Sequence, residues 1–298
     1  MKLAPVVLFV YNRPWHTRQT IEALQKNELA DQGDLIIYSD GLKNEQDRNN
    51  VAKVREYICN INGFKSVEVI ERQKNLGLAD SIIDGVTEVV NKYGRAIVLE
   101  DDLVSSPYFL KYMNDGLEFY KDEEQVISIH GYVYPIEKKL PETFFLHSAD
   151  CWGWGTWKRG WDLFEPDGTY LLSQLKKRKL LKRFDFDGAL SYSRMLKNQI
   201  ANRNDSWAVR WYASALLNNK LTLYPCKSLV SNIGLDSSGT HCSTTKVYDN
   251  VLANEPIQVG NVLLQEDEQA YQAFRHFLLA TKGGFWNRVV RFTKGLIT

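Results

Sequence analysis

The sequence lacks a dominant charge, a cysteine framework and a long hydrophobic run, and each absence excludes a class of protein. Lys and Arg number 37 against 36 Asp and Glu, so no overall positive field argues for a nucleic-acid partner. The four cysteines lie far apart without a CxxC pair, which argues against a zinc knuckle or disulfide scaffold and predicts free, buried thiols in a reducing cytosol. The sequence contains no uninterrupted apolar window of about 18 residues, so it predicts no membrane-spanning helix.

The N-terminal stretch MKLAPVVLFVYNRP also lacks the features of a signal peptide. Its apolar run is broken by Pro5, and no small-residue cleavage site follows. We therefore expect the functional surface to face the cytoplasm.

Short apolar runs alternate with helix-period segments over the first 130 residues. Runs of strand length occupy residues 6–11, 35–39, 67–70, 96–99 and 126–130. Apolar residues at helical spacing lie at 82–93 and at 110–120, and Ser106 with Pro107 is a candidate start for the second of these helices. The alternation predicts an α/β fold in which helices cover both faces of a mostly parallel sheet.

The amino-acid composition changes after residue 130, but the sequence contains no linker and no internal repeat. Trp- and Gly-rich sequence, CWGWGTWKRGWDLF, is followed by helical segments. We therefore expect a single domain over residues 1–280, in which residues 131–280 elaborate the first half. Residues 281–298 differ again and form a separate C-terminal tail.

Polar residues follow each of the first four predicted strands. The motifs are YNRP, SDG, ERQKN and EDD, in that order. Because ligands of open parallel sheets bind at the carboxyl ends of the strands, these groups are expected to converge. They suit a partly anionic ligand of nucleotide size.

The EDD motif, Glu100 to Asp102, places three carboxylates directly after an apolar strand. Side chains alternate along a strand, so one or two of the three can face a ligand together. That number suits Mg²⁺ or Mn²⁺, which one or two carboxylates hold together with substrate phosphates and water. The alternative is that Asp101 or Asp102 caps the next helix or pairs with Arg95 or Arg72.

The segment AIVLEDDLVSSPYFLKYMNDGLEFYKDEEQVISIHGY, residues 96–132, resembles the region around the metal-binding EDD of N-acetylglucosaminyltransferase I, a GT-A fold glycosyltransferase. The series VVLFVYNRP, YSDG, NLGLADSI and VLEDD also resembles bacterial GT-A transferases of surface polysaccharide synthesis, over roughly residues 4–130. The resemblance implies a GT-A glycosyltransferase of the hexosyltransferase type. Residues 1–130 would then bind the nucleotide-sugar and residues 131–280 the acceptor.

The resemblance also implies roles for five residues in the first half. Arg13 would meet the donor nucleotide, Asp40 would accept a hydrogen bond from a uracil-like base edge, and Asn75 would make another base contact. Asp101 would contact the ribose or donor sugar. Asp102 would bind the Mn²⁺ or Mg²⁺ that bridges the diphosphate and stabilises the charge on the leaving group.

An inverting transferase also needs a general base for the acceptor hydroxyl. The resembling family draws its base from an acid shortly before a Trp at a helix start, which suggests Asp205 ahead of Trp207 in NDSWAVRW. The first of the family's two adjacent acids is Asn204 in this sequence. Asp205 could instead be an N-cap, a role that Ser206 could share, and Asp150 is the second candidate base.

Tryptophan is concentrated in the second half, where aromatic faces could stack on an acceptor sugar. We expect Trp152, Trp154 and Trp207 to face the acceptor, because glycines flank the first two and let backbone approach a ligand. Trp157 and Trp161 are expected in the core.

His241 follows the Ser- and Gly-rich loop NIGLDSSGT. Several GT-A enzymes supply a histidine from a late loop as a metal ligand, and the resemblance implies that role for His241. A solvated loop histidine is the alternative.

Two basic segments could contact an anionic surface. Residues 176–183, KKRKLLKR, read as a solvated helix face or as a contact for anionic lipid or a phosphate-bearing acceptor. The tail contains GGFWNRVVRFTKGLIT, which places its aromatic and aliphatic residues on one side of a helix and its basic residues on the other. Such a helix can lie at a membrane interface or dock on a protein.

These observations predict a metal-dependent glycosyltransferase, cytoplasmic or peripheral on the membrane. It would move a sugar from a nucleotide-sugar, expected to be a UDP-sugar, to a glycan or lipid-linked acceptor in surface polysaccharide or lipopolysaccharide synthesis. A sugar-nucleotide pyrophosphorylase is an alternative, although no Gly-rich phosphate-cradling loop with a downstream Lys or Arg follows the first strand. A catalytically inactive carbohydrate-binding relative is another, because fold does not fix function.

Overall fold

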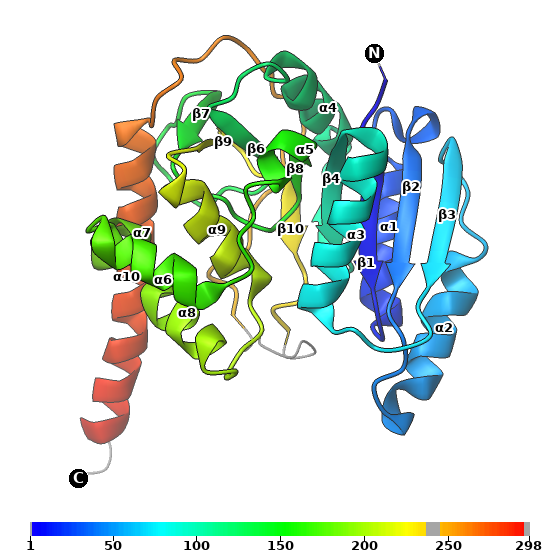
Figure 1. Ribbon diagram of the computed structural model, residues 1–298, viewed down its shortest axis with the longest axis horizontal. Coiled ribbons are helices and arrows are strands. Elements are labelled where there is room, and N and C mark those ends of the chain that lie inside the picture. Colours follow the sequence, from blue (N-terminus) through cyan, green and yellow to red (C-terminus); the bar gives the residue numbers. More distant parts are fainter. Residues whose placement is uncertain (1, 237–244, 295–298) are drawn as a thin grey trace.

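The computed structural model describes residues 2–236 and 245–294, the segment 282–294 by its backbone alone (Figure 1). The strands are β1 Val6–Val10, β2 Asp34–Ser39, β3 Ser66–Glu71, β4 Arg95–Glu100, β5 Leu103–Ser105, β6 Val126–His130, β7 Thr143–Leu146, β8 Trp154–Trp157, β9 Leu221–Pro225 and β10 Val230–Asn232. The α-helices are α1 Pro14–Gln25, α2 Arg48–Ile58, α3 Leu78–Tyr93, α4 Phe109–Phe119, α5 Lys158–Trp161, α6 Gly168–Lys177, α7 Leu181–Phe184, α8 Tyr192–Ile200, α9 Trp207–Leu217 and α10 Glu268–Lys294.

Within the described residues, eight strands form one sheet in the order β3-β2-β1-β4-β8-β6-β9-β7. The pairs β2–β3, β1–β2, β1–β4 and β6–β9 are parallel, whereas β8 runs antiparallel to β4 and β6, and β7 runs antiparallel to β9. The five strands expected from the sequence are β1, β2, β3, β4 and β6, each within one or two residues of the expected bounds. The prediction of an α/β fold with a mostly parallel sheet is confirmed.

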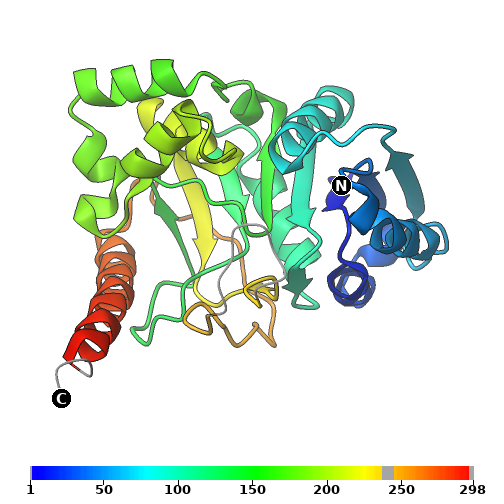
Figure 2. The ribbon, with the colours of Figure 1, turned by 90° about the horizontal axis from the view of Figure 1, so that it is seen from below.

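Alternating side chains of β1 divide the core between the two faces of the sheet. Val6, Leu8 and Val10 pack with α1, α2 and α4 on one face, and Val7 and Phe9 pack with α3 and α9 on the other. Seen from below, α1 and α3 lie on opposite sides of the sheet (Figure 2). Because both faces are covered, the central strands β1, β2 and β4 are mostly apolar, whereas the edge strand β3 alternates polar and apolar residues.

The second half of the chain adds to the sheet of the first half. Strand β8 inserts between β4 and β6, and β9 and β7 extend the sheet beyond β6. Trp157 and Trp161 are buried, at 5% and 4% exposure, as expected for core residues. A separate two-stranded sheet pairs β5, directly after the EDD motif, with β10.

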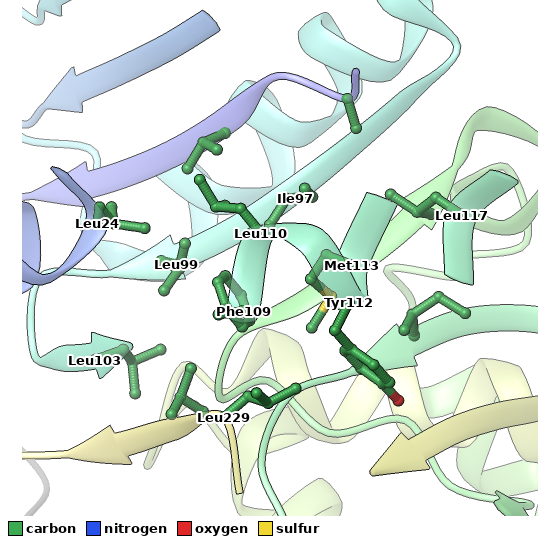
Figure 3. Close-up of a cluster of buried hydrophobic side chains, with 14 of the residues drawn as sticks. Leu24, Ile97, Leu99, Leu103, Phe109, Leu110, Tyr112, Met113, Leu117 and Leu229 are labelled. Carbon is green, nitrogen blue, oxygen red and sulfur yellow. The ribbon is translucent and has the colours of Figure 1, made fainter. Parts of the chain in front are cut away.

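Helix α4 packs on β4 and supports the end of that strand from below. Figure 3 shows Leu99 of β4 and Leu103 of β5 in the same cluster as Phe109 and Met113 of α4. The helix begins at Phe109, two residues later than expected, and Tyr108 is its N-cap residue. The Ser106 hydroxyl accepts from the Tyr108 N–H at 3.3 Å and donates to the backbone oxygen of Ala253 at 2.6 Å.

Helix α10 packs its first turns on the far end of the sheet. Phe274 contacts the rings of Phe144 on β7 and Tyr224 on β9, with centroid distances of 6.0 and 5.6 Å. Figure 1 shows the helix continuing away from the sheet toward the C-terminus. Side chains of the predicted amphipathic tail beyond residue 281 lie outside the described residues, and no helix in the described part is long and apolar enough to cross a bilayer.

Candidate active site

The carboxyl ends of β1, β2 and β4 bring three of the sequence motifs to one edge of the sheet. The parallel register pairs Val10 with Ser39 and Phe9 with Glu100, so the residues that follow these strands are neighbours. Arg13 precedes α1, and Asp40 and Asp101 come directly after β2 and β4. The convergence expected from the strand ends is therefore present.

Arg13 pairs with two carboxylates of the EDD motif. Its Nη2 donates to Oδ1 of Asp101 and lies 2.9 Å from Oδ2 of Asp102. Both aspartates are buried, and the Thr20 hydroxyl donates to the Asp101 backbone oxygen at 2.8 Å. Although burial lowers the pKa of the Arg13 guanidinium, the two carboxylates outweigh it and raise that pKa above its ordinary value.

The alternative partners considered for the motif are engaged elsewhere. Arg95 pairs with Glu118 at 3.0 Å, and Arg72 pairs with Asp84 at 2.5 Å. The alternative that Asp101 or Asp102 pairs with Arg95 or Arg72 is wrong, because both aspartates pair with Arg13.

Glu100 is the third carboxylate of the motif and has no hydrogen bond or ion pair with any described residue. Burial raises its pKa to about 8, with further contributions from the Asp102 and Asp101 charges. Burial also raises the pKa of Asp101, against the opposing effect of Arg13. Asp101 and Asp102 thus share one guanidinium while Glu100 remains unpaired within the described residues, and carboxylates outnumber cations in the motif.

The residues present fit a divalent cation that arrives together with a diphosphate. Asp101 and Asp102 offer carboxylate oxygens, which Mg²⁺ and Mn²⁺ prefer, and the cluster has surplus negative charge. In the described part of the chain, no three His, Cys, Asp or Glu side chains converge as a metal site, so phosphate and water would have to complete the coordination. His241, the other predicted ligand, lies outside the described residues.

The segment after β10 lies directly on Asp102. The Ile233 backbone N–H donates to the Asp102 backbone oxygen at 2.8 Å. A Cβ placed on Gly234 would lie 2.0 Å from Oδ2 of Asp102 and 2.9 Å from Nη1 of Arg13, so only glycine allows this approach. The sequence did not predict this role for Gly234, because nothing in the segment NIGLD indicates that it contacts Asp102.

Asp40 and Asn75 bind backbone of the same two loops. The Asp40 carboxylate accepts from the N–H groups of Gly41, Leu76 and Gly77 at 2.8, 2.9 and 3.0 Å. The Asn75 amide donates to the Gly41 carbonyl at 2.8 Å. Both side chains therefore fix the loops after β2 and β3 against each other, a role not foreseen from the sequence.

Asp205 is exposed and lies ahead of α9. The N-cap of α9 is Ser206, whose hydroxyl accepts from the Val209 N–H at 3.2 Å, so the alternative that Asp205 is the cap is wrong. Its Oδ2 would lie 3.9 Å from a Cβ placed on Gly77. Asp205 thus reaches the loop that Asp40 holds.

Asp150 accepts hydrogen bonds from two hydroxyl groups. It accepts from the Tyr224 hydroxyl at 2.7 Å and from the Ser148 hydroxyl at 3.4 Å, and burial raises its pKa. The pKa of the Cys151 thiol is raised first by burial and then by the charges of Glu100, Asp150 and Asp102. These three carboxylates therefore lie within electrostatic range of one thiol.

The tryptophans divide differently from the prediction. Trp154 and Trp207 are 1% and 3% exposed and stack on each other at a centroid distance of 5.4 Å, so the prediction that they face an acceptor is wrong. Their large apolar rings instead fill the core between the sheet and α9. Trp152 is half-buried and packs against Tyr132 at 4.7 Å and Tyr248 at 6.0 Å.

A cavity of about 260 Å³ opens beside Arg13. Its lining mixes polar and apolar side chains and consists of Asn12, Arg13, Pro14, Trp15, His16 and Asn50. Trp15 is 58% exposed, which is unusual for tryptophan. A larger cavity of about 530 Å³ lies at the opposite edge, where Leu3 and Asp34 precede or begin the strands, and contains none of the predicted site residues.

The described cysteines are all free. Cys59 is exposed, and Cys151 and Cys226 are half-buried, so the expectation of free thiols holds for these three whereas the expectation of full burial does not.

No protein-family model matches the chain, and no curated protein does either. Among solved structures, S. aureus TarS is 13% identical, with a TM-score of 0.42 over 77% of this chain and 36% of TarS. The mannosyltransferase PcManGT from Pyrobaculum calidifontis, solved with GDP-Man and Mn²⁺, is 11% identical, with a TM-score of 0.39 over 72% of this chain and 69% of that one. A UDP-glucose pyrophosphorylase complexed with UDP-glucose is 12% identical, with a TM-score of 0.37 over 75% of this chain and 90% of that one. At these identities and TM-scores the likenesses carry no conclusion about what this chain binds or does.

Proposed function

We propose that this chain is a GT-A fold glycosyltransferase of the hexosyltransferase type, which uses a nucleotide-sugar, preferably a UDP-sugar, to extend a glycan or lipid-linked acceptor in surface polysaccharide or lipopolysaccharide synthesis. The observation that supports it most is the cluster of Arg13, Asp101 and Asp102 at the carboxyl edge of the parallel strands, beside a cavity with an exposed Trp15. A guanidinium next to paired carboxylates can hold a diphosphate and its counter-cation.

In this proposal, Arg13 binds the donor diphosphate and Asp101 orients the ribose or sugar. Asp102, with Asp101 beside it, would hold Mn²⁺ or Mg²⁺, which as a Lewis acid would stabilise negative charge on the departing nucleoside diphosphate. Asp40 and Asn75 shape the base-binding edge through the loops that they fix. Trp152 offers a half-buried ring to the acceptor.

The proposed general base is Asp205 or Asp150, and the structure gives each a different qualification. Asp205 is exposed and has no hydrogen bond among the described residues, so its carboxylate is available to an incoming hydroxyl. Burial raises the pKa of Asp150, which makes its carboxylate a stronger base toward the acceptor hydroxyl. Inversion at the sugar carbon would follow from either.

The direct test is release of nucleoside diphosphate from a panel of nucleotide-sugars, with and without Mn²⁺. We expect release with at least one donor in the presence of Mn²⁺, and its loss in Asp102→Ala. Absence of release with every donor would contradict the transferase assignment. Formation of pyrophosphate from nucleoside triphosphate and sugar phosphate would identify a pyrophosphorylase instead.

We also propose contact with an anionic membrane surface through residues 176–183 at the end of α6 and in α7. Lys176, Lys177, Lys179 and Lys182 are exposed and have no ion pair with any residue of the described ranges. The other two basic residues are engaged, Arg178 with the Leu217 carbonyl at 2.7 Å and Arg183 with Glu266. The four lysines can therefore attract phosphate groups of lipids.

A further inference from the structure

We propose that Arg13 is an internal counter-ion, which occupies the cation site of Asp101 and Asp102 and leaves it when a nucleoside diphosphate arrives. The inference rests on the proposed function, since it concerns the carboxylates assigned there to the metal. It adds that metal binding is coupled to nucleotide binding, and that the coupling is located in one guanidinium.

The first step is that Arg13 and a metal would compete for the same oxygens. A single nitrogen, Nη2 of Arg13, donates a hydrogen bond to Oδ1 of Asp101 and lies 2.9 Å from Oδ2 of Asp102. All three side chains are largely shielded from water, with exposures of 18% for Arg13, 6% for Asp101 and 11% for Asp102. A divalent cation bound at these oxygens would lie next to the guanidinium, and the two positive charges would repel each other strongly in such a shielded place.

The second step is that Oδ2 of Asp102 is covered on another side as well. The Gly234 backbone lies so close that a Cβ there would be 2.0 Å from this oxygen. The Ile233 N–H holds the same segment to the Asp102 backbone at 2.8 Å. A metal therefore has to displace Arg13 and move the backbone at residues 233–234 before it can use this oxygen.

The third step is that a diphosphate gives Arg13 another anion to bind. Guanidinium groups bind phosphate oxygens in a bidentate manner, so Arg13 can exchange carboxylates for phosphate without becoming unpaired. The carboxylates then become available to the metal, whose remaining ligands the diphosphate supplies. Because coupling between two ligands is reciprocal, the nucleotide should tighten metal binding and the metal should tighten nucleotide binding by the same factor.

The experiment measures Mn²⁺ binding from the EPR signal of free Mn²⁺, on the full chain, without any turnover. Wild type is expected to bind Mn²⁺ at least about tenfold more tightly when UDP or GDP is present. Arg13→Met is expected to bind Mn²⁺ without nucleotide at least about tenfold more tightly than wild type, because the competing cation is gone. Asp102→Asn should remove this binding.

A matched control and a second variant protect the test from a folding defect. Arg95→Met removes an arginine of the same strand region, paired with Glu118 at 3.0 Å, and should leave Mn²⁺ affinity unchanged. Gly234→Ala forces the backbone away from Asp102 and should also increase Mn²⁺ affinity without nucleotide. Circular dichroism establishes whether each variant is folded. If Arg13→Met does not fold, the Mn²⁺ affinity of Gly234→Ala takes its place as the test.

Two results would overturn the inference. The first is that folded Arg13→Met, or Gly234→Ala if Arg13→Met does not fold, binds Mn²⁺ no more tightly than wild type. The second is that wild type binds Mn²⁺ equally well with and without nucleotide. Failure of the proposed function would show differently, as Mn²⁺ binding that follows these expectations while no nucleotide-sugar is turned over.

Discussion

At the scale of single residues, His130 is the most completely buried ionisable group that the proposed chemistry does not use. It ends β6, has 0% exposure, and neither ring nitrogen has a hydrogen-bond partner in the described structure. Burial lowers its pKa to about 3 from the ordinary 6.5. The folded chain therefore keeps this ring neutral at acidities where the unfolded chain protonates it.

This pKa predicts how stability depends on pH. Between pH about 6.5 and 3 only the unfolded chain protonates His130, so the free energy of unfolding falls by about 1.4 kcal/mol for each unit that the pH decreases. Above pH about 6.5 the ring is neutral in both states, and the stability is fully present. His130→Phe should lose less stability than wild type over this window, measured as urea unfolding free energies at several pH values. His276→Asn, on the exposed side of α10, should retain the wild-type slope. Equal slopes for His130→Phe and wild type would refute the prediction.

The choice between the two candidate bases is also a question about single residues. Replacement of the true base by Asn should lower kcat about 10²- to 10⁴-fold, whereas the other replacement should have a much smaller effect. If the base is Asp150, activity should fall with falling pH at a higher pH than for an ordinary Asp, since burial raises its pKa and the base acts deprotonated. The measurement is the pH profile of kcat/KM for wild type, Asp150→Asn and Asp205→Asn. Near-normal activity in both variants would mean that neither is the base.

The sequence predicted which residues gather at the site better than it predicted what they touch. Arg13, Asp40 and Asp101 converge because parallel strands end at one edge, a rule that needs no side-chain detail. The Arg13 pairing with Asp101 joins residues 88 positions apart, and no local pattern encodes it. Trp154 was misplaced because flanking glycines suit a ligand site and a crowded core equally well.

At the scale of elements, Asp40 connects β2 to the start of α3. Its carboxylate accepts from Leu76 and Gly77 N–H groups that the helix cannot satisfy by itself. Gly41 allows the loops to meet, because a Cβ there would lie 2.2 Å from the Lys74 carbonyl carbon. The buried Asp40 carboxylate therefore makes most of the hydrogen bonds that hold this edge, and the Asn75 amide adds one more.

Removal of that side chain should destabilise the chain measurably. Asp40→Ala removes a buried acceptor from three backbone N–H groups, one of them in a buried bond, and should lower the free energy of unfolding by about 1–3 kcal/mol. Asp40→Asn keeps one acceptor oxygen and should lose less. Asp84→Ala removes a 58%-exposed acid paired with Arg72 and should cost about 1 kcal/mol or less. Urea denaturation ranks the three, and an Asp40→Ala no less stable than Asp84→Ala would count against the role.

Periodicity predicted the elements of the first half because its central strands are mostly apolar, its edge strand β3 alternates polar and apolar residues, and amphipathic helices lie between them. It did not predict β8, whose sequence WGTW contains glycine and tryptophan and which runs against its neighbours. The start of α4 was placed two residues early, and the bond from the Ser106 hydroxyl to Ala253, 147 positions away, was not foreseen. Elements shaped by long-range contacts are the ones that local patterns miss.

At the scale of the whole molecule, the sheet carries the proposed donor cluster near β1 and β4, and the second half supplies the remaining candidates. Asp150 precedes β8 and Asp205 precedes α9, both of which pack against the first-half strands or α3. A metal, a donor and an acceptor would thus meet where the two halves join. The four unpaired lysines lie at a distance from this edge, on the helices beside α10 (Figures 1 and 2).

The lysines give a whole-molecule prediction, because electrostatic attraction to a bilayer is summed over a face. Each lysine near an anionic surface contributes about 1 kcal/mol, so replacing all four should weaken association with phosphatidylglycerol vesicles by well over tenfold. The variant replaces Lys176, Lys177, Lys179 and Lys182 by Gln, and the control replaces the equally exposed Lys26, Lys53, Lys138 and Lys139.

Vesicle sedimentation measures both proteins against wild type, with zwitterionic vesicles to identify binding that does not depend on lipid charge. Binding of wild type should weaken as salt rises, since exposed charges are screened within about 10 Å at 0.1 M ionic strength. If the two quadruple variants lose binding equally, the attraction reflects overall charge and not this face. If neither loses binding, the lysines are solvated helix ends, stabilised by the α6 C-terminal dipole, and a lipid-linked acceptor would have to reach the site without their help.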